Sequence, residues 1–125
     1  MSASQIILYA LIALIVFSWI RKALNKRKVK HYDAAEINNK IKTSRDVLLL
    51  DVRTNAERKS NHIKGSLHIP LNQLSKRTVE LKKFKDKEIV CYCRSGNRSL
   101  NAALILQKQG FNAANLKGGI TAWNY

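Results

Sequence analysis

Apolar residues dominate the first twenty positions of the chain. No charged side chain occurs from Ser2 to Ile20, and residues 6–20 are almost entirely aliphatic or aromatic. Twenty residues at about 1.5 Å each make a helix about 30 Å long, which matches the hydrocarbon core of a bilayer. Trp19 falls where such a helix meets the headgroups, a position that tryptophan favours. The pattern predicts a transmembrane helix over residues 1–20.

Two other interpretations of this run fit less well. A cleaved signal peptide carries positive charge before the apolar run and small residues after it, whereas here the charge follows and no such cleavage site is seen. A buried helix of a soluble domain is normally amphipathic, whereas this run is apolar on all sides. A membrane anchor fits both features.

Positive charge follows the apolar run at once. Six of the next ten residues are basic: Arg21, Lys22, Lys26, Arg27, Lys28 and Lys30. Basic residues beside a membrane helix stay preferentially in the cytoplasm, and each attracts anionic headgroups by about 1 kcal/mol. We therefore expect residues 21–30 to be a juxtamembrane linker at the plasma or inner membrane. The N-terminus would lie outside, and residues 31–125 would lie in the cytoplasm.

Short apolar runs and helical patterns alternate through residues 31–125. Strands are predicted at residues 47–50, 66–69, 89–93 and 113–116, and helices at residues 34–41, 54–59, 71–81 and 97–109. Asp33 is a good N-cap for the first of these helices, and Gly110 ends the last one. Since strands that alternate with helices form parallel sheets, the pattern predicts an α/β domain with a parallel sheet flanked by helices.

Composition narrows the class of protein. Apolar residues make up 46% of the chain, which is too many for disorder throughout. The two cysteines, Cys91 and Cys93, share one CYC tripeptide, which excludes a disulfide scaffold and favours a free thiol in a reducing compartment. His62 and His68 lie too far apart in sequence to indicate a metal pair. Neither a metal nor an organic cofactor is expected.

The chain is strongly basic, with a formal net charge of +15. This charge is compatible with a lipid or nucleic-acid surface binder, and equally with a solvated face or a funnel for small anions. Aromatic residues are not interleaved with the basic run, as base stacking would require. A lipid bilayer is therefore an expected partner, and a nucleic acid is not.

The segment IVCYCRSGNRS carries the candidate chemistry. Cys93 ends a predicted strand, a short loop follows, and a helix begins after the loop. Such a loop directs backbone N–H groups and a helix N-terminus at the sulfur, and Arg94 and Arg98 add positive charge. These effects favour the thiolate, so we expect the pKa of Cys93 to be lowered. The alternative is a buried cysteine at a strand end beside two solvated arginines.

Other loop residues add to this picture. Ser95 and Ser99 offer hydroxyl donors, and Gly96 permits a close backbone approach or a positive φ. Cys91 alternates with Tyr92 and is interpreted as a packed strand residue, with resolution of a Cys93 intermediate as its alternative role.

Polar residues near the strand at residues 47–50 are interpreted as structural. Asp51, at the strand end, is expected to fix a turn, and Arg53 is expected to pair with an acid such as Glu57. His62 and His68 are also given structural roles.

Four ordered motifs resemble the single-domain rhodaneses, the thiosulfate sulfurtransferases. CRSGNRS at residues 93–99 looks like the family's active-site loop. LLLDVR at residues 48–53, with Glu57 after it, resembles the family's DVR strand. HIKGSLHIP at residues 62–70 and LKGGITAW at residues 116–123 resemble two further motifs. The anchor and domain together resemble the membrane-bound rhodanese-like proteins of bacteria.

Two positions depart from the family's pattern. Lys59 stands where the family usually has an aromatic residue, and Asn61 stands where glycine commonly precedes the His-Ile pair. Both lie away from the cysteine loop in sequence, so they concern local packing rather than chemistry. Trp123, in the last motif, is expected to be a core residue or a lid over the last turn.

The resemblance implies a rhodanese-like fold and a sulfurtransferase that works through a persulfide on Cys93. The remaining loop residues would bind the substrate or shape the loop: Arg94, Ser95, Gly96, Asn97, Arg98 and Ser99. Asp51, Arg53 and Glu57 would give structural support. The donor would be thiosulfate or another small anionic persulfide, and the acceptor would be cyanide, glutathione or a protein thiol.

Three alternative functions remain. Cysteine phosphatases of related fold use a seven-residue Cys-x5-Arg loop, whereas here Arg98 is the sixth residue and Ser99 the seventh. The shorter loop resembles the sulfurtransferase version. Arsenate reduction would need partner thiols that the sequence does not identify. A non-catalytic interaction module would be favoured by loss of the loop cysteine, but Cys93 is present.

Overall fold

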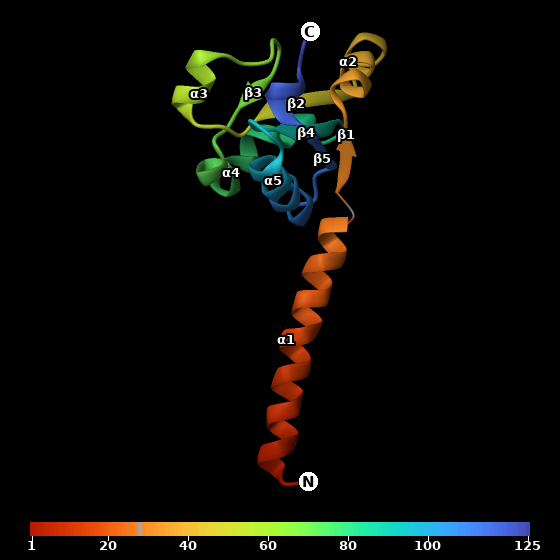
Figure 1. The fold of residues 1–125 in the computed structure, drawn as a ribbon, viewed down its shortest axis with the longest axis vertical. Coiled ribbons are helices and arrows are strands. Elements are labelled where there is room, and N and C mark those ends of the chain that lie inside the picture. Colours follow the sequence, from red (N-terminus) through yellow and green to blue (C-terminus); the bar gives the residue numbers. More distant parts are fainter. Residues whose placement is uncertain (28) are drawn as a thin grey trace.

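A long helix precedes an α/β domain in the computed structural model, which describes residues 1–27 and 29–125 (Figure 1). Helix α1 spans Ala3–Arg27 and extends away from the domain. Its segment Ala3–Leu24 is long and apolar enough to cross a membrane, and none of that segment is buried against the rest of the protein. The interpretation of this run as a buried core helix is therefore wrong.

The basic segment after the apolar run is partly helical. Arg21 and Lys22 are exposed in α1, which continues to Arg27. Lys28 lies outside the described residues, and strand β1 begins at Lys30.

Five parallel strands form the sheet in the order β1-β5-β4-β2-β3. Their bounds are Lys30–Tyr32 for β1, Val47–Asp51 for β2, Leu67–His68 for β3, Glu88–Tyr92 for β4 and Ala113–Leu116 for β5. The predicted parallel sheet is confirmed, and four of its strands fall where the apolar runs place them. Strand β1 was not predicted, because in the three residues KHY only Tyr32 is buried.

Helices cover both faces of the sheet (Figure 1). The α-helices are α2 Ala34–Thr43, α3 Asn55–Ser60, α4 Leu71–Arg77 and α5 Asn97–Lys108, and the 3₁₀ segments are η1 Thr78–Phe84 and η2 Gly119–Ala122. Asp33 caps α2 by accepting a 2.8 Å hydrogen bond from the N–H of Glu36, as expected. The helix predicted over residues 71–81 instead changes to 3₁₀ at Thr78, where two β-branched residues follow each other.

Alternation along β4 divides the core into two layers. Ile89, Cys91 and Cys93 lie on the face that α5 covers, together with its buried residues Ala103 and Leu106. The other layer contains Tyr32, Leu49, Val90 and Tyr92 of the strands, with Ile37 of α2. Because all the strands are parallel, their carboxyl ends meet at one edge, and Cys93 stands at that edge on the α5 face.

Candidate active site

Cys93 follows directly after β4 and begins the turn into α5. Its thiol is free, and the residue is 1% exposed. The N–H of Gly96 donates to Sγ at 3.1 Å, and the hydroxyl oxygen of Ser99 lies 3.3 Å from it. Gly96 has a φ of +118°, which a residue with a side chain rarely adopts. The tight loop that brings its N–H to the sulfur therefore depends on glycine.

Hydrogen bonds govern the ionisation of Cys93. Burial raises the pKa of the Cys93 thiol, but hydrogen bonding with the Ser99 side chain and with the backbone of Ser99, Gly96 and Ser95 outweighs burial, so the pKa is lowered. The expected direction is confirmed. The expected N–H groups of the loop are among the causes, together with the hydroxyl of Ser99.

Cys91 differs sharply from its neighbour. It is fully buried within β4, and this burial raises the pKa of its thiol. Its interpretation as a packed strand residue is confirmed. Of the two thiols, Cys93 is the one that ionises more readily.

Arg98, from the first turn of α5, pairs with Glu57 of α3. Its two Nη atoms donate to Oε1 and Oε2 at 2.6 and 2.9 Å. The hydrogen bonds from Arg98 lower the pKa of Glu57 to about 2. The prediction that Arg53 pairs with an acid such as Glu57 is therefore wrong for that acid, because Arg98 occupies both of its carboxylate oxygens.

Arg53 is engaged instead with Asp51, two residues before it. Nε and Nη2 of Arg53 donate to the Asp51 carboxylate at 3.0 and 2.9 Å, and the Arg53 N–H donates to Oδ1 at 3.0 Å. Asp51 thus fixes the turn after β2, as expected. Burial raises the pKa of Asp51, but its hydrogen bonds with Arg53 outweigh burial and lower it. Arg53 also donates to the backbone carbonyl of Asn61 at 2.6 Å and to its side-chain Oδ1 at 3.2 Å, so the side chain that departs from the family's pattern joins the same network.

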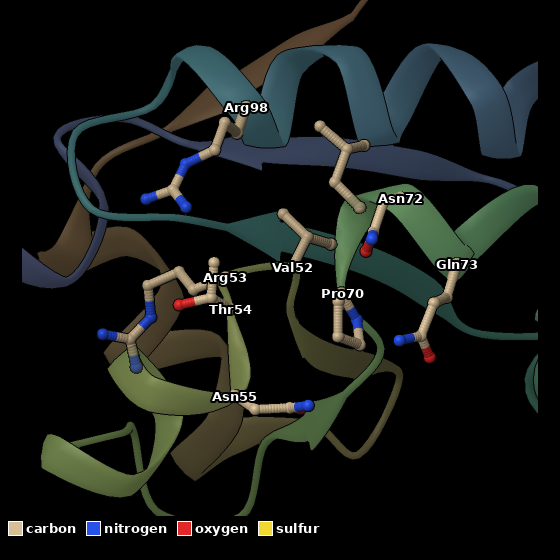
Figure 2. Close-up of a pocket in the computed structure, with 9 residues that line it drawn as sticks. Val52, Arg53, Thr54, Asn55, Pro70, Asn72, Gln73 and Arg98 are labelled. Atoms are coloured by element: carbon tan, nitrogen blue, oxygen red, sulfur yellow. The ribbon is translucent and has the colours of Figure 1, made fainter.

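Two hollows flank the Glu57–Arg98 pair. One, of about 460 Å³, is lined by Arg98 and by residues at the end of β2 and the start of α4 (Figure 2). Figure 2 shows the amide groups of Asn55, Asn72 and Gln73 around this hollow. The other, of about 280 Å³, is lined by Glu57, Arg94 and Thr121 among others. The pair therefore contributes to the walls of both hollows.

The loop predicted to bind substrate has an exposed and a buried side. Arg94, Ser95 and Asn97 are exposed, whereas Ser99 is fully buried. Arg98 is 38% exposed at its side chain. The exposed residues face solvent at the carboxyl edge of the sheet, and Ser99 faces the sulfur.

A glycine turn at the start of η2 holds the beginning of the loop. The N–H of Ile120 donates to the Cys93 carbonyl at 3.0 Å, and the N–H of Thr121 donates to the Arg94 carbonyl at 3.3 Å. Gly119 has a φ of +56°, and a Cβ on it would overlap both carbonyl groups. The glycine at position 119 thus allows the backbone of the last motif to pack directly against the cysteine loop.

A polar contact at Ser99 was missed by sequence reasoning. Its hydroxyl donates to Oδ1 of Asn115 at 2.5 Å, and Nδ2 of Asn115 lies 3.1 Å from Nδ1 of His31. Asn115 is 4% exposed inside β5. An asparagine within an otherwise apolar predicted strand was the available signal, because buried amides need partners.

The two other histidines differ in their surroundings. Nε2 of His68 forms a 2.7 Å hydrogen bond with the Arg53 carbonyl, and His62 is exposed. Trp123 is half-buried and packs edge-on against Tyr125, with 5.4 Å between ring centroids.

Comparison with known proteins gives matches over the α/β domain, which contains the cysteine loop. Residues 33–125 match the family model for the rhodanese-like domain. A sulfurtransferase of Allochromatium vinosum is 38% identical over 96 residues, which are 76% of this chain and 88% of that protein.

Solved structures are similar as well. A rhodanese-like domain protein of Staphylococcus aureus has a TM-score of 0.71 and 28% identity, over 77% of this chain and 92% of that one. A protein of Rhodopseudomonas palustris described as a possible tyrosine phosphatase has a TM-score of 0.69 and 25% identity, over 81% of this chain and 83% of that one.

Proposed function

The chain belongs to the rhodanese-like domain family, and from that premise we propose that it is a membrane-anchored sulfurtransferase that carries sulfane sulfur on Cys93. The observation that carries the proposal is the six-residue loop from Cys93 to Arg98. The N–H groups of this loop and the hydroxyl of Ser99, which follows it, lower the pKa of Cys93 at the carboxyl edge of the sheet. The relative in Allochromatium vinosum is itself named a sulfurtransferase.

The first half-reaction loads sulfur onto the enzyme. The Cys93 thiolate attacks the outer sulfur of thiosulfate, a new S–S bond forms, and the S–S bond of the donor breaks. Sulfite leaves with the bonding electron pair, and Cys93 becomes a persulfide anion. A low-molecular-weight persulfide would react in the same way and release its thiolate. Covalent catalysis of this kind divides one transfer into two easier steps.

The second half-reaction unloads the sulfur. An acceptor thiolate attacks the terminal sulfur of the Cys93 persulfide, and the Cys93 thiolate leaves. The acceptor gains the sulfur as its own persulfide, or as thiocyanate when cyanide is the acceptor. Both half-reactions pass through negative charge on sulfur, which the N–H of Gly96 and the hydroxyl of Ser99 stabilise.

Arg98 and Arg94 are proposed to bind the anionic donor. Both side chains reach the surface beside the loop, and Arg98 lines the larger hollow. Because Cys93 is only 1% exposed, the donor must enter past groups that cover it. Arg98 can exchange the carboxylate of Glu57 for the oxygens of the donor without losing an anionic partner.

The N-terminal helix is proposed to anchor the enzyme. Ala3–Leu24 has the length and apolarity of a membrane span, and Arg21 and Lys22 mark its cytoplasmic end. In this arrangement the domain lies in the cytoplasm, close to anionic headgroups that attract its basic surface.

A persulfide measurement tests the proposal. The full-length protein in detergent is treated with thiosulfate and analysed by intact mass. Wild type and Cys91→Ser should gain one sulfur atom, and Cys93→Ser should gain none. Hydrolysis of aryl phosphates by wild type, with no sulfur gained, would overturn the proposal and favour the phosphatase alternative.

A further inference from the structure

A row of polar groups leads from the surface of the sheet to the sulfur of Cys93. His31 is exposed on β1, Asn115 is 4% exposed in β5, and Ser99 is fully buried in α5. The successive contacts are 3.1 Å from His31 Nδ1 to Asn115 Nδ2, 2.5 Å from Asn115 Oδ1 to Ser99 Oγ, and 3.3 Å from Ser99 Oγ to Cys93 Sγ.

The register of the sheet produces this row. His31 and Cys91 are the β1 and β4 partners of Asn115 on its two sides. Paired residues in a parallel sheet point to the same face, and so does Cys93, two residues beyond Cys91. Ser99 comes down onto that face from the first turn of α5. The fold itself therefore brings the four groups into line.

The hydroxyl proton of Ser99 can serve only one acceptor at a time. In the structure it is donated to Oδ1 of Asn115, so that Ser99 presents lone pairs to Cys93. This direction suits a thiol, whose S–H can donate to Ser99 Oγ. At the other end, Nδ2 of Asn115 donates to an unprotonated Nδ1 of His31.

A thiolate or persulfide anion needs the opposite direction, because it has no proton to give. Ser99 must then turn its O–H to the sulfur, which takes the donor away from Asn115. If the amide turns over, Nδ2 donates to Ser99 Oγ, and Oδ1 accepts from a proton on His31 Nδ1. Every buried polar atom is again paired. The row thus has two complete hydrogen-bond directions, one for each state of the sulfur.

Resting on the proposed function, we infer that Asn115 and His31 are positioning residues that set the direction of the Ser99 hydroxyl proton and so control its hydrogen bond to the reacting sulfur. The other ionisable groups that act on Cys93 are Cys91, on the same strand, and Arg98, on α5. Glu57 reaches it only through Arg98. None of these groups touches the amide of Asn115 through a hydrogen bond found in the described part of the chain.

Substitution of the amide by a carboxylate tests the inference. In Asn115→Asp both oxygens accept only, so the Ser99 proton is held away from the sulfur. The measurement is the rate of Cys93 alkylation by iodoacetamide against pH, on the full-length protein, with peptide mapping. The midpoint should rise by about one pH unit or more, while the plateau rate at high pH stays close to wild type. A misfolded variant would also expose Cys93, which is 1% exposed in the fold, and so would raise the plateau rate together with the midpoint.

Asn115→Asp also introduces a negative charge, and the effect of that charge needs its own control. Removal of the Ser99 hydroxyl provides it. In a Ser99→Ala background no proton remains to be directed, so Asn115→Asp should raise the midpoint by clearly less than it does in wild type. The shape-matched Asn115→Leu removes the competing acceptor, and its midpoint should lie at or below that of wild type. An equal rise in both backgrounds, or a rise with Asn115→Leu, would overturn the inference.

His31 is tested at the surface, where the fold is not at risk. His31→Phe removes the ring nitrogen that pairs with the amide of Asn115 in both directions, so the midpoint should move away from its wild-type value. An unchanged midpoint would show that His31 is not a positioning residue. Alkylation needs no sulfur donor, so these results are separate from persulfide formation. If wild type gains sulfur while none of the midpoints moves, only the inference fails.

Discussion

Arg98 and Glu57 are joined by two hydrogen bonds of 2.6 and 2.9 Å, although they lie 41 residues apart in the chain. The pair connects the first turn of α5 to the short helix α3. It leaves Arg98 positioned beside the cysteine loop and still 38% exposed, so the guanidinium is both oriented and accessible to an anion. From this relationship we expect Glu57 to contribute to the stability of the fold.

Glu57→Gln should destabilise the protein by about 1 kcal/mol at neutral pH, since the pair is partly exposed. The pKa of Glu57 falls from 4.5 to about 2 in the folded protein. Its stabilising effect is therefore complete above about pH 4.5 and is lost as the pH falls toward 2. Denaturant unfolding of both proteins at pH 7 and pH 3 should show a smaller difference at pH 3. An equal difference at the two values would contradict this role.

Ser99→Ala and Arg98→Ala should affect different quantities. Ser99 is among the principal causes of the lowered Cys93 pKa, so its loss should raise the alkylation midpoint by about one pH unit. Arg98→Ala should raise the midpoint less but increase the KM for thiosulfate severalfold, because it removes a charge that binds the donor. Lys42→Ala on α2 serves as the control for loss of one exposed positive charge. If Arg98→Ala moved the midpoint more than Ser99→Ala, the hydrogen-bond explanation would be wrong.

Gly119→Ala should destabilise the protein by about 3 kcal/mol, because its Cβ would overlap the carbonyl groups of Cys93 and Arg94. Gly65 is a matched control, since its φ is also positive but a Cβ there meets nothing within 4 Å. Gly65→Ala should cost only about 1 kcal/mol for the left-handed backbone. Thermal unfolding of the two variants compares the costs, and similar losses would show that backbone strain alone matters at Gly119.

The elements were predictable where local pattern decides them. The apolar runs at β2, β4 and β5 are buried in the sheet, and Asp33 and Gly110 act at the ends of helices. Strand β1 was not predicted, because its three residues have no strand pattern of their own. They form a strand only by pairing with β5, 84 positions further along the chain.

The candidate site likewise has a part that the local sequence predicts and a part that only the fold determines. The loop from Cys93 to Ser99 is contiguous, so its chemistry could be predicted from its own residues. The partners of Arg53 and Glu57 could not, because several acids and arginines are near in sequence and only the fold decides which meet. Asn115 reaches the site through the register of β5, which sequence spacing does not reveal.

Anchoring by α1 can be tested through the middle of the helix. Membrane binding of the full chain should resist high salt and yield to detergent, because apolar burial is insensitive to ionic strength. Ile12→Lys puts a charge at the centre of Ala3–Leu24, at a cost of about 3 kcal/mol, and should lower the membrane fraction. Ser2→Lys, just before this segment, is the control and should leave the membrane fraction unchanged. Release of wild type by salt alone would contradict a spanning helix.

The proposed orientation rests on the basic residues at the carboxyl-terminal end of the apolar segment rather than on its apolar residues. Arg21 and Lys22 are exposed in α1 and lie in the last turn of the apolar segment Ala3–Leu24. Moving a positive charge across the membrane is unfavourable, so these residues should hold the domain in the cytoplasm. A reporter fused after Tyr125 should therefore be cytoplasmic in wild type. Replacing both residues by Gln should increase the fraction of molecules whose reporter lies outside, while Lys42→Gln on α2, far along the chain from the span, should not. If the double variant kept the wild-type orientation in full, the basic residues beside the span would not be what sets it.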